Sequence, residues 1–115
     1  MRKANFGNKQ SRRALKSALE ILDFKDGSPE EIYLRIYNAI VIFINQKLGY
    51  GKAGYSNGEI LDIFKNHGLN EICPHLEKIL LKIEAERFSP ISNQDAKVDL
   101  DKIKELFKDA HSGWN

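Results

Sequence analysis

The sequence predicts an all-α fold, a small irregular bundle of about five helices that forms one domain of 115 residues. Apolar residues recur at intervals of three and four along most of the chain, and no useful stretch alternates as a strand does. The segment Pro29–Leu48 is apolar on nearly all sides, which predicts a central helix covered by its neighbours. Its uninterrupted apolar run, residues 39–44, is far shorter than the roughly 18 residues that cross a bilayer.

The first two helices are expected at about residues 8–24 and at Pro29–Leu48. Leu15 and Leu19 lie on one apolar stripe of the first helix, which Asp26-Gly27 should break. The second helix has Ser28 to cap it, a proline at its first position and a glutamate at capping-box spacing, and it should stop at Gly49.

The next two helices carry their own start and stop signals. Ser56 and Glu59 repeat the capping-box spacing, and Gly68 should terminate the third helix. Asn70 is the expected cap of the fourth helix, which Ser89-Pro90 should close.

The last part of the chain is expected to contain a loop and one helix. Residues 91–98 are polar and predict a loop. An amphipathic helix should follow at about residues 99–110, with Leu100 and Ile103 on its apolar stripe. The tail, residues 111–115, should fray.

Charge is unevenly distributed along the chain. Residues 1–16 hold six of the 18 basic residues and no acid, so the remainder, with 12 basic against 16 acidic residues, has a net charge of −4. Such a segment can be a solvated helix face, a contact with an anionic membrane surface, or a contact with the phosphates of a nucleic acid. Nucleic acid is not expected as a partner, because this segment has a single aromatic residue, Phe6, in place of a set of base-stacking aromatics, and no recognisable reader motif. The candidate contact residues are Arg2, Lys3, Lys9, Arg12, Arg13 and Lys16.

The stretch of residues 49–54 matches the letters of the G-x-G-x-x-G phosphate-binding turn. That turn must follow a strand and open a helix, whereas here it follows a helix, so we predict an ordinary loop and no cofactor. A weaker alternative is that an anion binds near the start of the third helix, in contact with Lys52 and Ser56.

Catalysis and metal binding are not expected. The chain has three histidines and one cysteine, without the compact spacing of a zinc site. Cys73 excludes an internal disulfide and is expected to be a small core residue. No residue pattern indicates a positioned nucleophile and base, so we do not expect an enzyme.

In addition, the chain resembles the C-terminal cytoplasmic domain of BatD-type aerotolerance (oxygen-tolerance) proteins. The order and the spacing of the matching pieces agree over nearly the whole chain. The matching pieces are Arg2-Lys3-Ala4-Asn5, Tyr37-Asn38-Ala39-Ile40, Gln46-Lys47-Leu48-Gly49, Ser56-Asn57-Gly58-Glu59-Ile60, Phe64-Lys65-Asn66-His67-Gly68-Leu69 and Ile83-Glu84-Ala85-Glu86-Arg87-Phe88-Ser89-Pro90. The Gly49–Gly54 loop departs from the resemblance, because it looks longer and richer in glycine.

The resemblance implies a membrane-anchored protein with a large periplasmic part, one transmembrane helix and this helical domain in the cytoplasm. The chain would then be a fragment of a longer protein, and its basic start would lie beside the inner membrane. Implied partners are von Willebrand A-type proteins, tetratricopeptide proteins and a MoxR-type ATPase, and no catalytic residue is implied. We therefore expect a non-catalytic interaction domain on the cytoplasmic face of the bacterial inner membrane. The alternative is a small-ligand or anion-binding domain that uses the Gly49–Ser56 loop.

Overall fold

The structure is a computed structural model that describes residues 2–24 and 27–115, and within them the side chains from residue 11 onward. Five helices and no strand are found in these ranges, so the all-α prediction is confirmed. The helices are α1 (Arg2–Ile21), α2 (Pro29–Leu48), α3 (Asn57–Asn66), α4 (Cys73–Ala85) and α5 (Asn93–Gly113).

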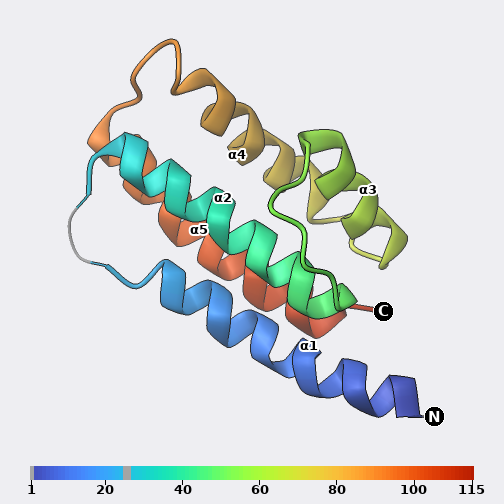
Figure 1. The fold of residues 1–115 in the computed structure, drawn as a ribbon. Coiled ribbons are helices and arrows are strands. Elements are labelled where there is room, and N and C mark those ends of the chain that lie inside the picture. The colour runs from blue at the N-terminus through green and yellow to red at the C-terminus, as the bar shows by residue number, and fades with distance from the viewer. Residues whose placement is uncertain (1, 25–26) are drawn as a thin grey trace.

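The second helix lies at the centre, as predicted. Helix α2 packs against α1, α4 and α5, and α3 packs mainly against α4. Figure 1 shows α1, α2 and α5 side by side, with α4 on the other side of α2 and α3 beside α4. The side chains of Ile36, Ile40, Phe43 and Ile44 are completely removed from solvent. One stripe of α2 remains uncovered, because Leu34 is 59% exposed.

The predicted helix starts at Ser28 and Ser56 are both present. The Ser28 hydroxyl accepts a hydrogen bond from the Glu31 amide at 3.2 Å. At α3, both halves of the Ser56–Glu59 capping box are formed. The predicted stops also hold, since Gly49 and Gly68 have φ angles of 72° and 80°, where a side chain would be strained.

The first helix occupies a different range from the one predicted. Helix α1 runs from Arg2 to Ile21, not over residues 8–24. Arg35 of α2 donates a hydrogen bond to the Ile21 carbonyl at 3.1 Å, and its guanidinium lies 4.3 Å from the Phe24 ring centroid. The hydrogen bond satisfies a carbonyl at the end of α1, before residue 24, where the helix was expected to end. Both contacts come from Arg35, which belongs to another helix.

The expected cap of the fourth helix is wrong. Helix α4 begins at Cys73 with Ile72 at the cap position, and no side chain caps it. Residue Asn70 instead lies in the turn that links α3 to α4, where the Ile72 amide donates to the Leu69 carbonyl at 3.1 Å. The helix also ends at Ala85, before the predicted Ser89-Pro90 stop.

The predicted loop at residues 91–98 is mostly helical, and this boundary is corrected. Helix α5 starts at Asn93 because the Ser92 hydroxyl accepts a hydrogen bond from the Asp95 amide at 3.1 Å. Ala96 in its first turn is completely buried, so the apolar stripe begins earlier than the sequence pattern indicated. Residues 91–98 have a polar sequence because most of them lie on the solvent-facing side of the helix.

The tail is packed, not frayed as expected. Helix α5 continues to Gly113, and the Trp114 ring stacks on His67 with ring centroids 4.3 Å apart. The Asn115 amide also donates to the His67 carbonyl at 3.1 Å. The end of the described chain is therefore held against the end of α3.

No helix within the described residues combines the length and the apolar character needed to cross a membrane.

Candidate interaction surface

The outer face of α1 carries exposed cations. Ala14 and Ala18 are fully buried on the inner face, where their small side chains let α1 approach α2 closely. Arg12, Arg13 and Lys16 are exposed. The other three predicted contact residues, Arg2, Lys3 and Lys9, belong to the helical range of α1, but their side chains lie outside those that the structure describes.

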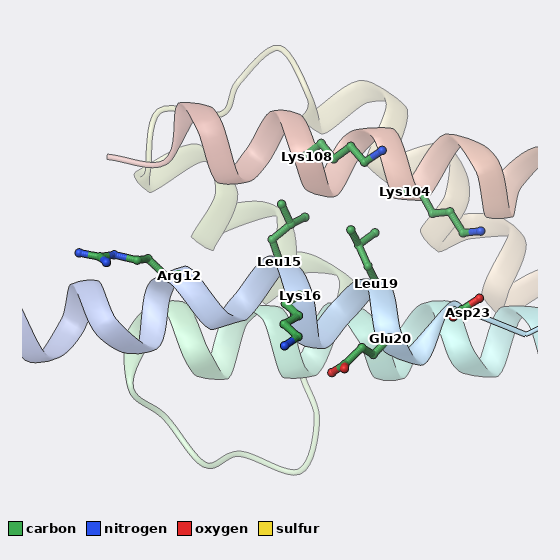
Figure 2. Close-up of a pocket in the computed structure, with 8 residues that line it drawn as sticks. All are labelled: Arg12, Leu15, Lys16, Leu19, Glu20, Asp23, Lys104 and Lys108. Atoms are coloured by element: carbon green, nitrogen blue, oxygen red, sulfur yellow. The ribbon is translucent and has the colours of Figure 1, made fainter.

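Helix α5 adds two cations that the sequence analysis missed. Lys104 and Lys108 line a groove between α1 and α5 together with Arg12 and Lys16. Figure 2 shows Lys104 and Lys108 along α5, Arg12 at one end of the α1 segment, and Lys16 on the side of α1 that points away from α5. The spacing of Lys104 and Lys108 is a helical i, i+4 pair, but only the packing of α5 against α1 places the pair beside the α1 cations.

The groove has an apolar floor and a volume of about 570 Å³. Leu15 and Leu19, one turn apart on α1, are half-buried and point toward α5 (Figure 2). Glu20 and Asp23 lie at the end of the groove away from Arg12. The groove therefore has four cations around two leucines and a small acidic end.

The groove cations form no ion pair within the part of the chain that the structure describes. No carboxylate there lies within 4.0 Å of Arg12, Lys16, Lys104 or Lys108. Like charges on facing helices repel each other, and a bound anion would relieve that repulsion. The arrangement favours binding of negatively charged groups that also present apolar surface.

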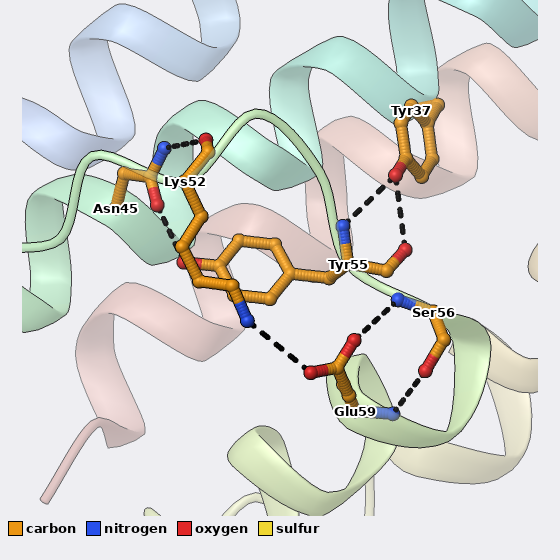
Figure 3. Close-up of polar contacts among 6 residues, drawn as sticks. All are labelled: Tyr37, Asn45, Lys52, Tyr55, Ser56 and Glu59. Atoms are coloured by element: carbon orange, nitrogen blue, oxygen red, sulfur yellow. Dashed lines mark hydrogen bonds and ion pairs between the residues drawn. The ribbon is translucent and has the colours of Figure 1, made fainter.

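The Gly49–Ser56 loop is held by side chains of α2 (Figure 3). The Tyr37 hydroxyl accepts from the Tyr55 amide at 3.0 Å and donates to the Tyr55 carbonyl at 2.9 Å. Asn45 donates to the Lys52 carbonyl at 2.8 Å and accepts from the Tyr55 hydroxyl at 2.5 Å. The loop lies between two helices, and the turn geometry of a dinucleotide site does not apply to it.

The two predicted anion contacts, Lys52 and Ser56, both interact with Glu59. The Lys52 amine lies 3.2 Å from the Glu59 carboxylate, which also accepts from the Ser56 amide at 2.9 Å (Figure 3). The Ser56 amide first, and then Lys52, hold the pKa of the Glu59 carboxyl below its usual value. An external anion at this place would have to compete with that carboxylate.

A partly buried amine joins three helices near the end of the bundle. Lys47 of α2 donates to the Ser11 hydroxyl at 2.7 Å and lies 2.9 Å from His111 Nδ1. Its amine is also 5.5 Å from the ring centroids of Phe43 and Trp114. Burial lowers the pKa of Lys47 to about 8. Sequence reasoning missed this cluster, because Lys47 reads as an ordinary basic residue in the last turn of a helix.

A buried carboxylate connects α2, α4 and α5. Asp99 is only 6% exposed and accepts from the Tyr33 hydroxyl at 2.5 Å, while the Lys82 amine lies 3.1 Å away. Burial, followed by the hydrogen bond and charge of Asp99, raises the pKa of the Tyr33 hydroxyl far above its usual value. We interpret the network as structural, since its three side chains satisfy one another.

The histidines and the cysteine lie apart. His67 ends α3, His75 is exposed on α4 and His111 is on α5. Within the described ranges, no group of three or more possible metal ligands comes together. Cys73 is buried, as predicted, and its thiol donates to the Leu69 carbonyl at 3.4 Å. Burial raises the pKa of this thiol, which makes it a weaker nucleophile.

A second groove, of about 730 Å³, has the opposite charge. It lies between α2, the start of α3 and α4, and its apolar residues include Leu34 and Ile83. Glu30, Glu84 and Glu86 also line it, together with one cation, Arg87. Two of these carboxylates already have partners, since Glu84 accepts from the Asn57 side chain and Glu86 accepts from the Ile91 amide.

No family model, curated protein or solved structure gives a significant match to this chain. The resemblance to BatD-type proteins therefore stays a prediction from the sequence motifs.

Proposed function

We propose that this chain is a non-catalytic interaction domain that lies against the anionic cytoplasmic face of a bacterial inner membrane. The observation that supports the proposal is the set of exposed cations on α1, which includes Arg12, Arg13 and Lys16. Their charges point away from the core, because the alanines of the opposite face pack on α2. The sequence resemblance adds the context of a membrane-anchored aerotolerance protein, with the domain as its cytoplasmic part.

The energetics of such a contact are favourable. Each Lys or Arg near an anionic surface contributes about 1 kcal/mol, so three exposed cations correspond to about a 100-fold gain in membrane partitioning. The attraction should weaken with salt, since the Debye length falls from about 10 Å at 0.1 M to about 3 Å at 1 M.

The rest of the surface would remain available to proteins. The resemblance suggests von Willebrand A-type and tetratricopeptide proteins and a MoxR-type ATPase as partners. In this proposal the domain supplies a rigid, membrane-apposed surface and performs no reaction itself.

The test is sedimentation with vesicles of phosphatidylglycerol and phosphatidylethanolamine at low salt. The variant Arg12→Gln/Arg13→Gln/Lys16→Gln should bind about 100-fold more weakly than wild type. The matched control is Lys65→Gln/Lys78→Gln/Lys102→Gln, which removes the same charge from exposed positions on α3, α4 and α5. We expect less than about a threefold loss for the control. Equal losses in both variants, or no binding of wild type at low salt, would contradict the proposal.

A further inference from the structure

We propose that the groove between α1 and α5 docks an acidic amphipathic helix of a partner protein, which lies parallel to α5. The inference goes beyond membrane contact, because it assigns a different class of partner to a groove that shares Arg12 and Lys16 with the membrane-facing surface and adds Lys104 and Lys108 of α5. It rests on the apolar residues of the groove, on its cations and on the position of its acidic end.

The apolar residues of the groove favour a helical partner that has an apolar stripe. Leu15 and Leu19 lie between the two helices and point from α1 toward α5 (Figure 2), whereas Arg13 is an exposed residue of α1 that does not line the groove. An amphipathic helix laid between two helices can reach such leucines with its own apolar stripe. Leu15 and Leu19 are one turn apart, so a helix lying along α1 can match them with residues at the same spacing.

The charge of the groove indicates that the docked helix is acidic. Arg12 and Lys16 on α1 repeat at i, i+4, as do Lys104 and Lys108 on α5, so two rows of cations border the leucines. Side chains at this spacing are about 5 to 6 Å apart, which matches acidic residues at i, i+4 on a facing helix. Such a helix would bring carboxylates within ion-pair distance of these cations, which have none within 4.0 Å in the described part of the domain.

The two ends of the groove differ in charge, and this difference sets the direction of the docked helix. The acidic end, with Glu20 and Asp23, favours the positive N-terminus of a helix, and the Arg12 end favours the negative C-terminus. Figure 2 shows Lys104 toward the Asp23 end and Lys108 above Leu15. The docked helix therefore runs parallel to α5 and antiparallel to α1.

The test uses a designed 18-residue helical peptide, which has leucines on one stripe and glutamates beside it, with a fluorescent label. A matched peptide carries lysine at each glutamate position. In fluorescence anisotropy, wild-type protein should bind the glutamate peptide at least about 10-fold more tightly than the lysine peptide. The variant Lys104→Glu/Lys108→Glu should lose about 10-fold or more of that affinity.

Two controls separate this proposal from general charge effects and from the membrane proposal. Lys65→Glu/Lys78→Glu has the same change in net charge on α3 and α4 and should bind the glutamate peptide within about threefold of wild type. Arg13→Gln lies outside the groove lining and should weaken vesicle binding while leaving peptide binding unchanged. Circular dichroism melts should show that each variant remains folded.

The orientation is read from a paramagnetic label at the N-terminus of the peptide, which should broaden the amide signals of Glu20 and Asp23. Broadening at Arg12 would overturn the assigned direction. Equal affinity for both peptides would overturn the docking proposal. The docking proposal would also be overturned if anionic vesicles, and not the peptide, shifted the methyl signals of Leu15 and Leu19. It would likewise be overturned if sedimentation equilibrium showed that the groove holds a second copy of this chain.

Discussion

Two charged side chains, one buried and one partly buried, are stabilised in different ways. Asp99 has both a hydroxyl donor, Tyr33, and a cation, Lys82. Lys47 has only neutral partners within the described residues, the Ser11 hydroxyl and the His111 ring. A buried charge that lacks an opposite charge destabilises the folded state, so the two sites should respond differently to pH and to mutation.

Lys47 should make stability rise with pH in the alkaline range. Its pKa is lowered from 10.5 to about 8 in the folded chain by burial, so the unfolded chain binds more protons between these values. The free energy of unfolding of wild type should therefore increase by about 1 kcal/mol from pH 7 to pH 10 relative to Lys47→Met, after allowance for the partial solvent exposure of the amine.

Urea unfolding of both proteins across this pH range measures the difference. The comparison removes contributions that the two proteins share, including those of the buried Tyr33 and Cys73. Lys78→Met, which changes an exposed lysine of α4, should run parallel to wild type. A pH-independent difference between wild type and Lys47→Met would show that this amine is well solvated in the folded state.

The Asp99 network should behave as one unit. Asp99→Asn should lower the free energy of unfolding by about 1 to 3 kcal/mol, since it weakens two charge-assisted interactions of a buried group. Tyr33→Phe alone should cost about 1 kcal/mol, and much of that cost should disappear when Asp99 is already Asn. A double-mutant cycle at pH 7 measures the coupling, and additive effects would contradict the network.

Residues whose role is indicated by their neighbours in the sequence were predicted correctly. Residues whose role depends on contacts with distant parts of the chain were not. Ser56 and Gly68 act within one turn of their own helix, so spacing along the chain was sufficient. Asn70 had a suitable side chain for a cap, but the Leu69–Ile72 turn occupies that place. Asp99 was missed because nothing local marks a carboxylate whose partners lie 17 and 66 residues away.

At the scale of elements, helix number and type followed from the sequence, while some boundaries depended on tertiary packing. Helix α2 has the predicted bounds because both of its ends carry local caps. Helix α5 starts earlier than expected because Ala96 packs into the core and Ser92 caps the first turn. The end of α1 is determined partly by Arg35 of another helix, which no periodicity in α1 can reveal.

Ser92 should be necessary for the first turn of α5. Ser92→Ala removes the side chain that accepts from the Asp95 amide and should lower the free energy of unfolding by about 1 kcal/mol. Hydrogen exchange at residues 93–96 should also become faster. Ser89→Ala, at an exposed position of the preceding turn, is the control and should have no measurable effect. Unchanged stability and exchange in Ser92→Ala would indicate that this serine does not cap α5.

At the scale of the whole molecule, the buried apolar centre leaves recognition to the outer surface. The core around Ile40 and Phe43 is filled, and the grooves lie between helices at the periphery. The α1 half of the cationic surface was predictable from sequence, because Arg12, Arg13 and Lys16 belong to one charge run. The α5 half was not, because Lys104 and Lys108 join it only through the antiparallel packing of α1 and α5.

The most direct test of the account is an NMR titration of the ¹⁵N-labelled domain with nanodiscs. Nanodiscs that contain phosphatidylglycerol should perturb amide signals in residues 11–20, on the cationic face of α1, and neutral phosphatidylcholine nanodiscs should leave them unchanged. Perturbations that cluster instead at Lys52–Glu59, or no response to the anionic nanodiscs at low salt, would contradict the assignment of α1 as the membrane-facing surface.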